Sequence, residues 1–536
     1  MKTLGVYLAE LLEDYGVDTI FGIPGVHTVE LYRGLPNTRI RHVTPRHEQG
    51  AGFMADGYAR ATGKPGVCLV ITGPGMTNIL TAMAQAYADS IPMLVISAVN
   101  GLGKMGSGNG HLHELKDQRR LAEGAAAFSH TVFTPADLDQ AVARAFALFS
   151  GARPRPVHIE IPTDIITMDC SAHRGPGAAT LPLRGAPRHE PLGEAAALLA
   201  SARAPLLLVG GGAVDASAEI RELAERLDAP VIMTVNGRGI LPPGHPLSVS
   251  ANASLPAPRA LMAEADVILA IGTEIGPTDY DWNEEGPATL NGSLIRVDID
   301  PEQAMRGHRA ACIIIADAAE TARELLSLVP SKGSRDGAAR SRRARAAIAR
   351  DGLNLTYRAS LAMLETVRQT LPDAVIVGDS AQPVYAASVA YEAERPRAFF
   401  CSATGFGTLG YALPAAIGAK IGQPDRPVIC LIGDGGLQFS VGELASAVEA
   451  KTPIIILLWN NFGYGEIKSF MVSRQIQPIG VDIGTPNFVL LAKAFGAASE
   501  RLEAPDDLAR LLSEAASRNV PTLIEINEAS YVEAKG

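Results

Sequence analysis

Several features that mark other classes of protein are scarce in this sequence. Aromatic residues make up only 5% of its 536 residues, and its five cysteines (Cys68, Cys170, Cys312, Cys401 and Cys430) are scattered, with no CxxC pair. We therefore expect neither a disulfide framework nor a zinc site, and a reducing compartment fits the thiols. No apolar run approaches the ~18 residues that a membrane span needs, and the N-terminal residues lack the apolar core of a signal peptide. These absences predict a cytoplasmic protein without membrane contact.

An excess of positive charge is also missing. Lysine and arginine number 47 against 57 acidic residues, which gives a net charge of −10. A nucleic-acid-binding protein would be expected to carry a basic surface, so nucleic acid is not an expected partner. The chain is 47% hydrophobic and 19% charged, which excludes a disordered protein and allows large cores. At roughly 150 residues per domain, three to four domains are expected.

Two stretches of the sequence are predicted to be linkers. Residues 171–192 contain Pro and Gly without periodicity, and residues 331–352 form a basic, Ala- and Arg-rich segment, which we interpret as a solvated linker helix. They divide the chain into blocks at about 1–170, 190–330 and 353–536.

Each block alternates short apolar runs with helical patterns, which is typical of an α/β protein with parallel sheets covered by helices. The runs lack polar alternation, as strands buried on both faces do. Strands are predicted at 67–71, 206–209, 267–271 and 454–458, and amphipathic helices at 4–15, 136–150, 217–227 and 504–518.

The outer blocks share a faint internal repeat. In the first, a strand runs into Gly73-Pro74-Gly75, and a second strand begins at Pro92. In the third, a strand runs into Gly433-Asp434-Gly435, and a second strand begins at Pro453. Two blocks of one ancestral fold would explain this outline, although many βαβ units share it.

A candidate anion and metal site lies in the third block. The loop Gly433-Asp434-Gly435-Gly436 follows the strand 428–432 and opens a helix, where glycines and a helix N-terminus favour an anion. Asn460-Asn461 follows at the end of the next strand, with 24 residues between Gly435 and Asn460. Because consecutive parallel strands end at one edge of a sheet, Asp434 and Asn461 should converge there and bind Mg²⁺ with phosphate oxygens. The alternative is that Asp434 only caps a helix and the asparagines turn a loop.

The spacing GDG-x24-NN resembles the thiamine diphosphate motif of the acetolactate synthase and 2-oxo acid decarboxylase superfamily, and the resemblance covers essentially the whole chain. It implies an α/β fold of three doubly wound parallel-sheet domains: pyrimidine-binding (1–170), central (190–330) and diphosphate-binding (353–536). It implies thiamine diphosphate and Mg²⁺ as cofactors, with Asp434, Asn461 and the carbonyl of Gly463 as metal ligands. The other cofactor-binding residues that it implies are Pro74, Asn78, Ser380, Ala381, Gln382, Gly433, Gly435, Gly436, Tyr464 and Gly465.

Glu48 occupies the position of the family's catalytic glutamate, in the segment 46–59. A carboxyl in an apolar pocket can share a proton with the aminopyrimidine ring of the cofactor, which activates the thiazolium carbon. Without the resemblance, Glu48 would be read as an ordinary first-turn glutamate. The segment 405–414 matches the family region that bends the cofactor, with Leu409 as the wedge and the backbone of Gly407 and Leu409 bonded to the pyrimidine.

The resemblance also leads to expectations about the oligomeric state and about FAD binding. In the family the glutamate and the metal site meet across a subunit interface, so we expect a homodimer or a dimer of dimers. Family synthases bind FAD in the central block through an Arg-Phe-Asp-Asp-type segment, and the corresponding residues 272–281 lack that order. We therefore expect no FAD, and we read Gly210-Gly211-Gly212 as a generic βα turn.

The substrate is a small 2-oxo acid by the same resemblance. His27 and His113, and less so His111, match positions near the cofactor; the alternative for each is an ordinary loop histidine. The segments around His27, Glu48, His113 and Asn461 look most like those of 5-guanidino-2-oxopentanoate (2-ketoarginine) decarboxylases. Such a guanidinium tail would need a carboxylate or carbonyl partner, for which Glu466 and Glu114 are candidates; Glu466 replaces an apolar residue of the synthases.

Three alternatives remain open. One is an acetolactate synthase-like carboligase that uses pyruvate. The second is a non-catalytic protein that keeps the fold and binds thiamine diphosphate, against which the intact Glu48, Asp434, Asn461 and Leu409 argue. The third is an NAD-dependent dehydrogenase, which is disfavoured because no GxGxxG opens a helix with an acidic residue about 20 positions on.

Overall fold

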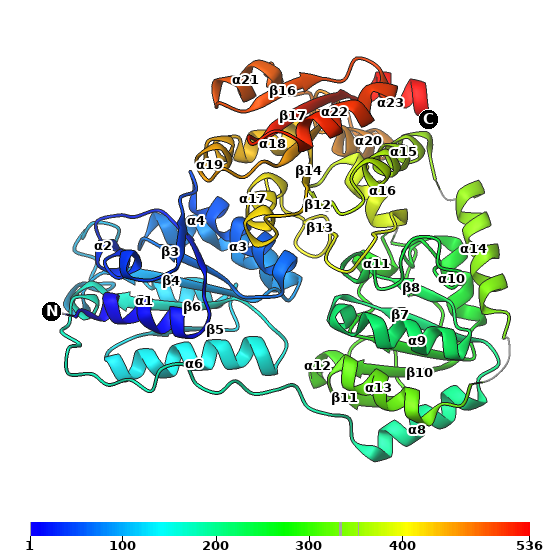
Figure 1. The fold of residues 1–536 in the computed structure, drawn as a ribbon, viewed down its shortest axis with the longest axis horizontal. Helices are drawn as coiled ribbons and strands as arrows, with labels where there is room; N and C mark the ends of the chain where they lie inside the picture. The colour runs from blue at the N-terminus through cyan, green and yellow to red at the C-terminus, as the bar shows by residue number, and fades with distance from the viewer. Residues whose placement is uncertain (1, 283, 332–334, 352) are drawn as a thin grey trace. The chain divides into compact units, whose positions relative to one another are not determined.

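The computed structural model describes residues 2–282, 284–331, 335–351 and 353–536. These residues form three parallel β-sheets with helices between successive strands (Figure 1). By their internal contacts they group into two compact units. The first contains residues 1–183, 405–501 and 514–525, and the second contains 184–404, 502–513 and 526–536.

The N-terminal sheet has the strand order β2-β1-β3-β4-β6-β5, and every pairing is parallel. Its strands are β1 (Thr19–Gly22), β2 (Arg41–Val43), β3 (Gly66–Val70), β4 (Met93–Val99), β5 (Phe128–Thr131) and β6 (Val157–Pro162). The helices are α1 (Leu4–Asp14), α2 (Val29–Tyr32), α3 (Glu48–Thr62), α4 (Pro74–Ala88), α5 (Gln118–Glu123), α6 (Pro135–Gly151) and α7 (Thr163–Ile166).

The C-terminal sheet has the strand order β13-β12-β14-β15-β17-β16. Taken in chain order, its six strands are arranged as in the N-terminal sheet, so the internal repeat predicted from the loops is confirmed. The strands are β12 (Val375–Gly378), β13 (Phe399–Cys401), β14 (Val428–Gly433), β15 (Ile455–Asn460), β16 (Ala498–Arg501) and β17 (Thr522–Asn527). The helices are α15 (Leu355–Thr370), α16 (Gln382–Ala390), α17 (Ala412–Gly422), α18 (Asp434–Ser440), α19 (Glu443–Glu449), α20 (Gly465–Ser473), α21 (Phe488–Ala494), α22 (Leu508–Ala516) and α23 (Glu528–Lys535).

The central sheet has the order β11-β10-β9-β7-β8. Its strands are β7 (Pro205–Val209), β8 (Val231–Met233), β9 (Val267–Ile271), β10 (Ser293–Asp298) and β11 (Cys312–Ile315). The helices are α8 (His189–Ser201), α9 (Ser217–Leu227), α10 (Pro256–Glu264), α11 (Pro277–Tyr280), α12 (Pro301–Ala304), α13 (Ala318–Leu328) and α14 (Gly337–Asp351).

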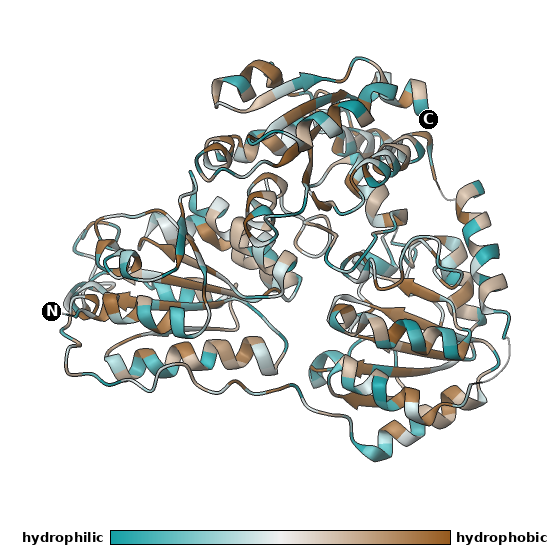
Figure 2. Cartoon of the chain, viewed as in Figure 1, coloured by the Kyte–Doolittle hydropathy of each residue, from teal (hydrophilic) through white to brown (hydrophobic). Residues whose placement is uncertain are grey.

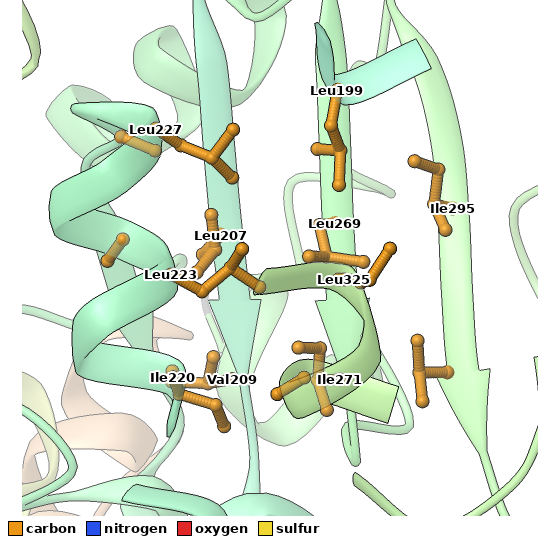
Figure 3. Packing of buried hydrophobic residues seen from close by; sticks show 14 of the residues in the cluster. Leu199, Leu207, Val209, Ile220, Leu223, Leu227, Leu269, Ile271, Ile295 and Leu325 are labelled. Carbon is orange, nitrogen blue, oxygen red and sulfur yellow. The ribbon is translucent and has the colours of Figure 1, made fainter. Parts of the chain in front are cut away.

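Each face of the central sheet carries its own hydrophobic core. Leu207 and Val209 of β7 pack with helices α8, α9 and α13 on one face (Figure 3), whereas Leu206 and Leu208 pack with α10 and α14 on the other. Because successive side chains of a strand point to opposite faces, a strand buried on both sides must be apolar throughout. Strands β7 and β9 of this sheet are accordingly hydrophobic along their length (Figure 2).

The basic segment 331–352 departs from its prediction in one respect. Residues 337–351 do form a helix, α14, but Ala344 and Ile348 are buried against the second core of the central sheet. The prediction of a solvated helix was therefore wrong for one face, because its few apolar residues are spaced to form a stripe. Residues 332–334 and 352 of this segment lie outside the described part of the chain.

The remaining predicted elements are found with small shifts at their ends. The helix expected at 504–518 is a short 3₁₀ turn followed by α22. The glycines after β7 are needed for packing: a Cβ on Gly210 would lie 2.3 Å from the carbonyl oxygen of Gly272, in the loop after β9. Of the helices that the structure describes, none is both long enough and apolar enough to cross a lipid bilayer.

Candidate active site

Glu48 is the first residue of α3. The side chain of His47 caps this helix by accepting a hydrogen bond from the Gln49 N–H, and Gly63, at φ +77°, ends it. The Glu48 carboxylate reaches the first turns of α4, where Asn78 donates to it over 2.9 Å. A Cβ on Gly75 would lie 3.5 Å from the other carboxylate oxygen, so α4 approaches closely. The structure thus brings together Glu48, Asn78 and the start of α4 at Pro74.

His27 and His113 form a pair of neighbouring rings. Their centroids lie 5.2 Å apart, and the buried Nδ1 atom of each ring has no hydrogen-bond partner among the described residues. Burial, together with the neighbouring His113, lowers the pKa of His27, so its imidazole is neutral at pH 7. A Cβ on Gly73 would lie 2.9 Å from that of His113, which places the pair beside the start of α4. The structure thus brings the two histidines together near the start of α4.

The loop that carries His113 is held by two residues with separate roles. Glu114 accepts hydrogen bonds from the Gly108 N–H, the Ser107 hydroxyl and the His111 N–H, and these hold its pKa below the ordinary value. Gln118 is buried and accepts from the Thr72 hydroxyl and the Gly73 N–H. Glu114 therefore shapes the loop, and Gln118 ties it to α4. Sequence reasoning missed Gln118, because its partners lie far away in the chain.

The metal-site prediction is tested at the ends of β14 and β15. These strands pair in parallel with Gly433 opposite Trp459, so Asp434 and Asn461 leave the sheet side by side. The side-chain amide of Asn461 lies 3.1 Å from Asp434 Oδ1 and 2.7 Å from the carbonyl oxygen of Gly463. If the Asn461 amide oxygen faces Asp434 and Gly463, three oxygens lie together without a hydrogen between them, and a bound cation would offset their repulsion. With the nitrogen turned there, the amide donates to both.

Asp434 itself supports a cation at this point. It is buried, and its Oδ2 atom accepts no hydrogen bond from any described residue. Burial raises its pKa, and backbone N–H groups including those of Asn461 and Gly435 act in the opposite direction. One carboxylate, one amide oxygen and one carbonyl oxygen form the oxygen-only ligand set of a hard cation, so these residues fit Mg²⁺. Within the described residues no cluster of three His, Cys, Asp or Glu side chains has the geometry of a metal site.

Asn460, the first of the paired asparagines, has a different role. It is buried, and it donates to Glu525 over 2.8 Å and accepts from the Phe462 N–H over 3.1 Å. These bonds hold the loop that presents Asn461 and Gly463. The sequence indicated both asparagines without separating these roles.

Glycines shape the surroundings of Asp434. A Cβ on Gly435 would lie 2.7 Å from the Tyr464 ring, and one on Gly465 would lie 2.6 Å from the Asn461 amide. At Gly463 a Cβ would lie 2.4 Å from the carbonyl oxygen of Val481, whose segment also accepts the Tyr464 N–H. The backbone can therefore come close to a ligand at the N-terminus of α18.

The other predicted cofactor residues lie at loop ends. Gln382 begins α16, and Ser380 donates its N–H to Asp379. Gly407 has φ +72°, a conformation that favours glycine, and Leu409 is half-buried. Within the described part of the chain, no hydrogen bond joins the Glu48 group to the Asp434 group. Roles for Ser380, Ala381, Gln382, Gly407 and Leu409 remain predictions.

Fold and site together define a thiamine pyrophosphate enzyme. The family models described as the N-terminal TPP binding domain, the central domain and the C-terminal TPP binding domain of these enzymes match residues 2–121, 192–325 and 379–526. The chain belongs to this family, and thiamine diphosphate is its cofactor. The predicted domain limits of 1–170, 190–330 and 353–536 remain a prediction.

Within this family, the chain is similar to a decarboxylase and to acetolactate synthases. The chain is 46% identical over 533 residues to the probable 2-ketoarginine decarboxylase AruI of Pseudomonas aeruginosa, which covers 98% of this chain and 94% of that protein. It is 32% identical over 530 residues to the large subunit of acetolactate synthase isozyme 1 of Escherichia coli, covering 97% and 93%. It is 30% identical over 547 residues to a probable acetolactate synthase large subunit of Methanocaldococcus jannaschii, covering 97% and 90%.

Proposed function

We propose that the protein decarboxylates 5-guanidino-2-oxopentanoate to 4-guanidinobutanal and CO₂, without oxidation, and that the reaction requires thiamine diphosphate and Mg²⁺. The observation that carries this proposal is the 46% identity, over nearly the whole chain, to a protein named as a 2-ketoarginine decarboxylase, against 32% to an acetolactate synthase subunit. Both relatives are matched almost from end to end, so the difference does not come from a missing domain. The proposed role is in arginine breakdown.

The metal would be held by Asp434, Asn461 and the carbonyl of Gly463. The short distances from the Asn461 amide to Asp434 Oδ1 and to the Gly463 carbonyl, and the unpaired Asp434 Oδ2, support this assignment. The Gly433–Gly436 loop would hold the diphosphate, and Ser380, Ala381 and Gln382 stay predicted cofactor-binding residues. Bound thiamine diphosphate supplies a carbon nucleophile and an electron sink, which allow a 2-oxo acid to lose CO₂.

Glu48 is the proposed group that holds and moves a proton at the pyrimidine end of the cofactor. One oxygen of the Glu48 carboxylate accepts a hydrogen bond from the Asn78 amide, and this bond fixes the orientation of the carboxylate. Carboxyl groups are suited to general acid–base catalysis when a neighbour orients them within reach of the proton. Asn78 and Pro74, at the start of α4, belong to the same proposed contact.

His27 and His113 are proposed catalytic residues beside Glu48. The two half-buried rings lie together near the start of α4, and a histidine can give or take a proton at a bound substrate. Their proximity disfavours two positive charges, and the lowered pKa of His27 accords with a neutral ring.

Glu466 is the proposed partner of the substrate's guanidinium group. It stands where the synthases carry an apolar residue, and Glu114 is the rival candidate. We expect Glu466→Gln to raise KM for 5-guanidino-2-oxopentanoate by about tenfold or more, because a charge-assisted hydrogen bond contributes about 1.5–3 kcal/mol. KM for an uncharged 2-oxo acid should change little. Steady-state kinetics with both substrates measures the difference, with Glu114→Gln as the matched control; equal effects on the two substrates would discard the assignment.

A homo-oligomer with active sites at the subunit interface is proposed as well. No side chain of α20 is buried, and the segment 462–479 exposes large apolar side chains, a feature that often marks a protein interface. The exposed residues are Phe462, Ile467, Phe470, Val472, Ile476 and Ile479. The proposed assembly is a homodimer or a dimer of dimers. We continue to expect no FAD and a cytoplasmic location.

A second candidate is an acetolactate synthase-like carboligase that acts on pyruvate. The 32% identity over 97% of the chain to a synthase subunit favours it over other family activities. The product formed from pyruvate distinguishes the two: acetolactate for the synthase, an aldehyde for the decarboxylase.

A further inference from the structure

Glu443, the first residue of α19, is a buried carboxylate bonded to backbone N–H groups far away in the chain. Its side chain is only 2% exposed. One carboxylate oxygen accepts the Arg46 N–H over 3.0 Å and the His47 N–H over 3.1 Å, and the other accepts the Arg46 N–H over 3.1 Å. These two N–H groups directly precede Glu48.

The surroundings of Glu443 are shaped to receive this carboxylate. A Cβ on Gly50 would lie 2.2 Å from its Oε1 atom, so only glycine leaves room for it at that position of α3. Farther along α19, Glu449 pairs with the Arg46 guanidinium, and the carbonyl of Ala450 accepts a hydrogen bond from Arg41 over 2.7 Å. One helix of the C-terminal segment is thus anchored along the strand and loop that lead to Glu48.

These hydrogen bonds lie at the start of α3, where they can fix the backbone that leads into Glu48. A helix leaves its first N–H groups without partners inside the helix, and an acceptor placed there fixes where the helix begins. The carboxylate also lies at the positive end of the α3 dipole, which stabilises its charge. Burial raises the pKa of Glu443, and the N–H groups of Arg46 and His47 are among the contacts that lower it. The backbone entering Glu48 is therefore held by Glu443, while Asn78 holds its side chain.

We propose that Glu443 is a positioning residue for Glu48: by holding the Arg46 and His47 N–H groups, it sets the direction in which α3 presents the proton-relay carboxyl. The inference rests on the proposed function, since it assigns a role in the reaction through Glu48. Helix α19 follows α18, which begins at Asp434, so a single segment of the chain carries the metal-site residue and supports the proton-relay residue.

The test compares Glu443→Asp, Glu443→Gln and Glu449→Gln in the full-length enzyme. The aspartate is one methylene too short to reach both N–H groups, whereas the glutamine keeps an oxygen where Oε1 accepts both. Glu449→Gln is the matched control, because it loses a contact of the same helix to the same segment through a side chain only. Two quantities are measured: amide hydrogen exchange of residues 46–50 without cofactor or substrate, and kcat and KM with cofactor.

We expect Glu443→Asp to increase exchange at residues 46–50 at least tenfold with the exchange of β14 and β15 unchanged. Its kcat should fall about 100-fold with KM nearly unchanged, the size of effect that a misplacement of about 1 Å produces. Glu443→Gln should restore both properties to within a few-fold of the wild type, and Glu449→Gln should leave both unchanged.

Two results would overturn the proposal. One is wild-type exchange at residues 46–50 in Glu443→Asp; the other is increased exchange with unchanged kcat. If Glu443→Asp loosens the whole protein, Glu443→Gln decides: a folded glutamine variant with a large loss of kcat but normal exchange at 46–50 contradicts positioning through these N–H groups. If the wild type turns over no 2-oxo acid, the proposed function fails while the exchange result still stands.

Discussion

The two carboxylates that the proposed reaction depends on have different surroundings. Glu48 is half-buried and receives one amide hydrogen bond from Asn78. Asp434 is buried and has one oxygen without a partner among the described residues. A buried acceptor without a donor is costly, so its retention suggests a ligand that satisfies it. A proton-transfer role suits the first carboxylate and a metal-ligand role suits the second.

Replacement of Glu48 by glutamine should abolish most of the activity without unfolding the protein. The amide keeps the size of the side chain and an oxygen for Asn78 but cannot accept and return a proton. We expect kcat to fall by about 10²- to 10⁴-fold, the usual contribution of general acid–base catalysis. The decarboxylation rate and the melting temperature are measured together; a near wild-type rate would remove Glu48 from the mechanism.

Removal of the metal should weaken the protein as well as inactivate it. A ligand that binds only the folded state stabilises it according to its concentration and affinity. Addition of Mg²⁺ and thiamine diphosphate to chelator-treated protein should therefore raise the melting temperature by several degrees. Asp434→Asn should lose most of this rise. Asp482→Asn is the control, because Asp482 pairs with Lys468 on the segment beside the same loop. An undiminished rise in Asp434→Asn would contradict the metal assignment.

At the scale of elements, the closest helix pair of the first unit depends on two glycines. A Cβ on Gly57 of α3 would lie 2.0 Å from the Ala415 carbonyl oxygen, and one on Gly418 of α17 would lie 1.9 Å from that of Met54. The backbones of the two helices therefore meet directly, and α3 carries Glu48 at its start.

Gly418→Ala should force these helices apart. Overpacking a core lowers the free energy of unfolding by about 1–3 kcal/mol. Because the added methyl group would clash with rigid backbone, we expect a loss at or above the upper end of this range. Gly193→Ala in α8, where a Cβ meets open space, should stabilise the protein by about 0.5–1 kcal/mol. Denaturant midpoints of the two variants should move in opposite directions; equal shifts would show that α3 and α17 are not in backbone contact.

Strand β6 gives a prediction about pH. His158 is buried between Ser97 and Ser129, and burial lowers its pKa to about 3. Below its ordinary pKa of about 6.5, the unfolded chain binds a proton that the folded protein excludes. Stability should therefore fall as pH drops from 6.5 towards 3, by about 1.4 kcal/mol per unit from this group. His158→Gln should be less stable at pH 7.5 but lose this part of the slope, so its urea midpoint approaches that of the wild type at pH 5. Parallel pH curves would contradict the assignment.

At the scale of the whole molecule, the sequence was most informative where the signal is local. Apolar runs located the buried strands β3, β7, β9, β14 and β15, and the matching glycine loops predicted the repeat that the strand orders of the outer sheets confirm. The spacing between Asp434 and Asn461 predicted their meeting, because neighbouring parallel strands bring their ends together.

Contacts between distant parts of the chain could not be predicted in the same way. The bond from Asn460 to Glu525 and those from Glu443 to Arg46 and His47 join residues that no periodicity relates. The buried face of α14 was missed because its charge outweighs a narrow apolar stripe. Residues that support the site therefore emerged only from the fold, whereas residues with chemical motifs were visible in the sequence.

The most direct test of the account is CO₂ release by the purified enzyme with Mg²⁺ and thiamine diphosphate, comparing 5-guanidino-2-oxopentanoate with pyruvate and identifying products by mass. The account predicts a strong preference for the guanidino acid, 4-guanidinobutanal as the product, and no turnover when either cofactor is withheld. Preference for pyruvate with acetolactate as the product would contradict it and assign the protein to the synthases.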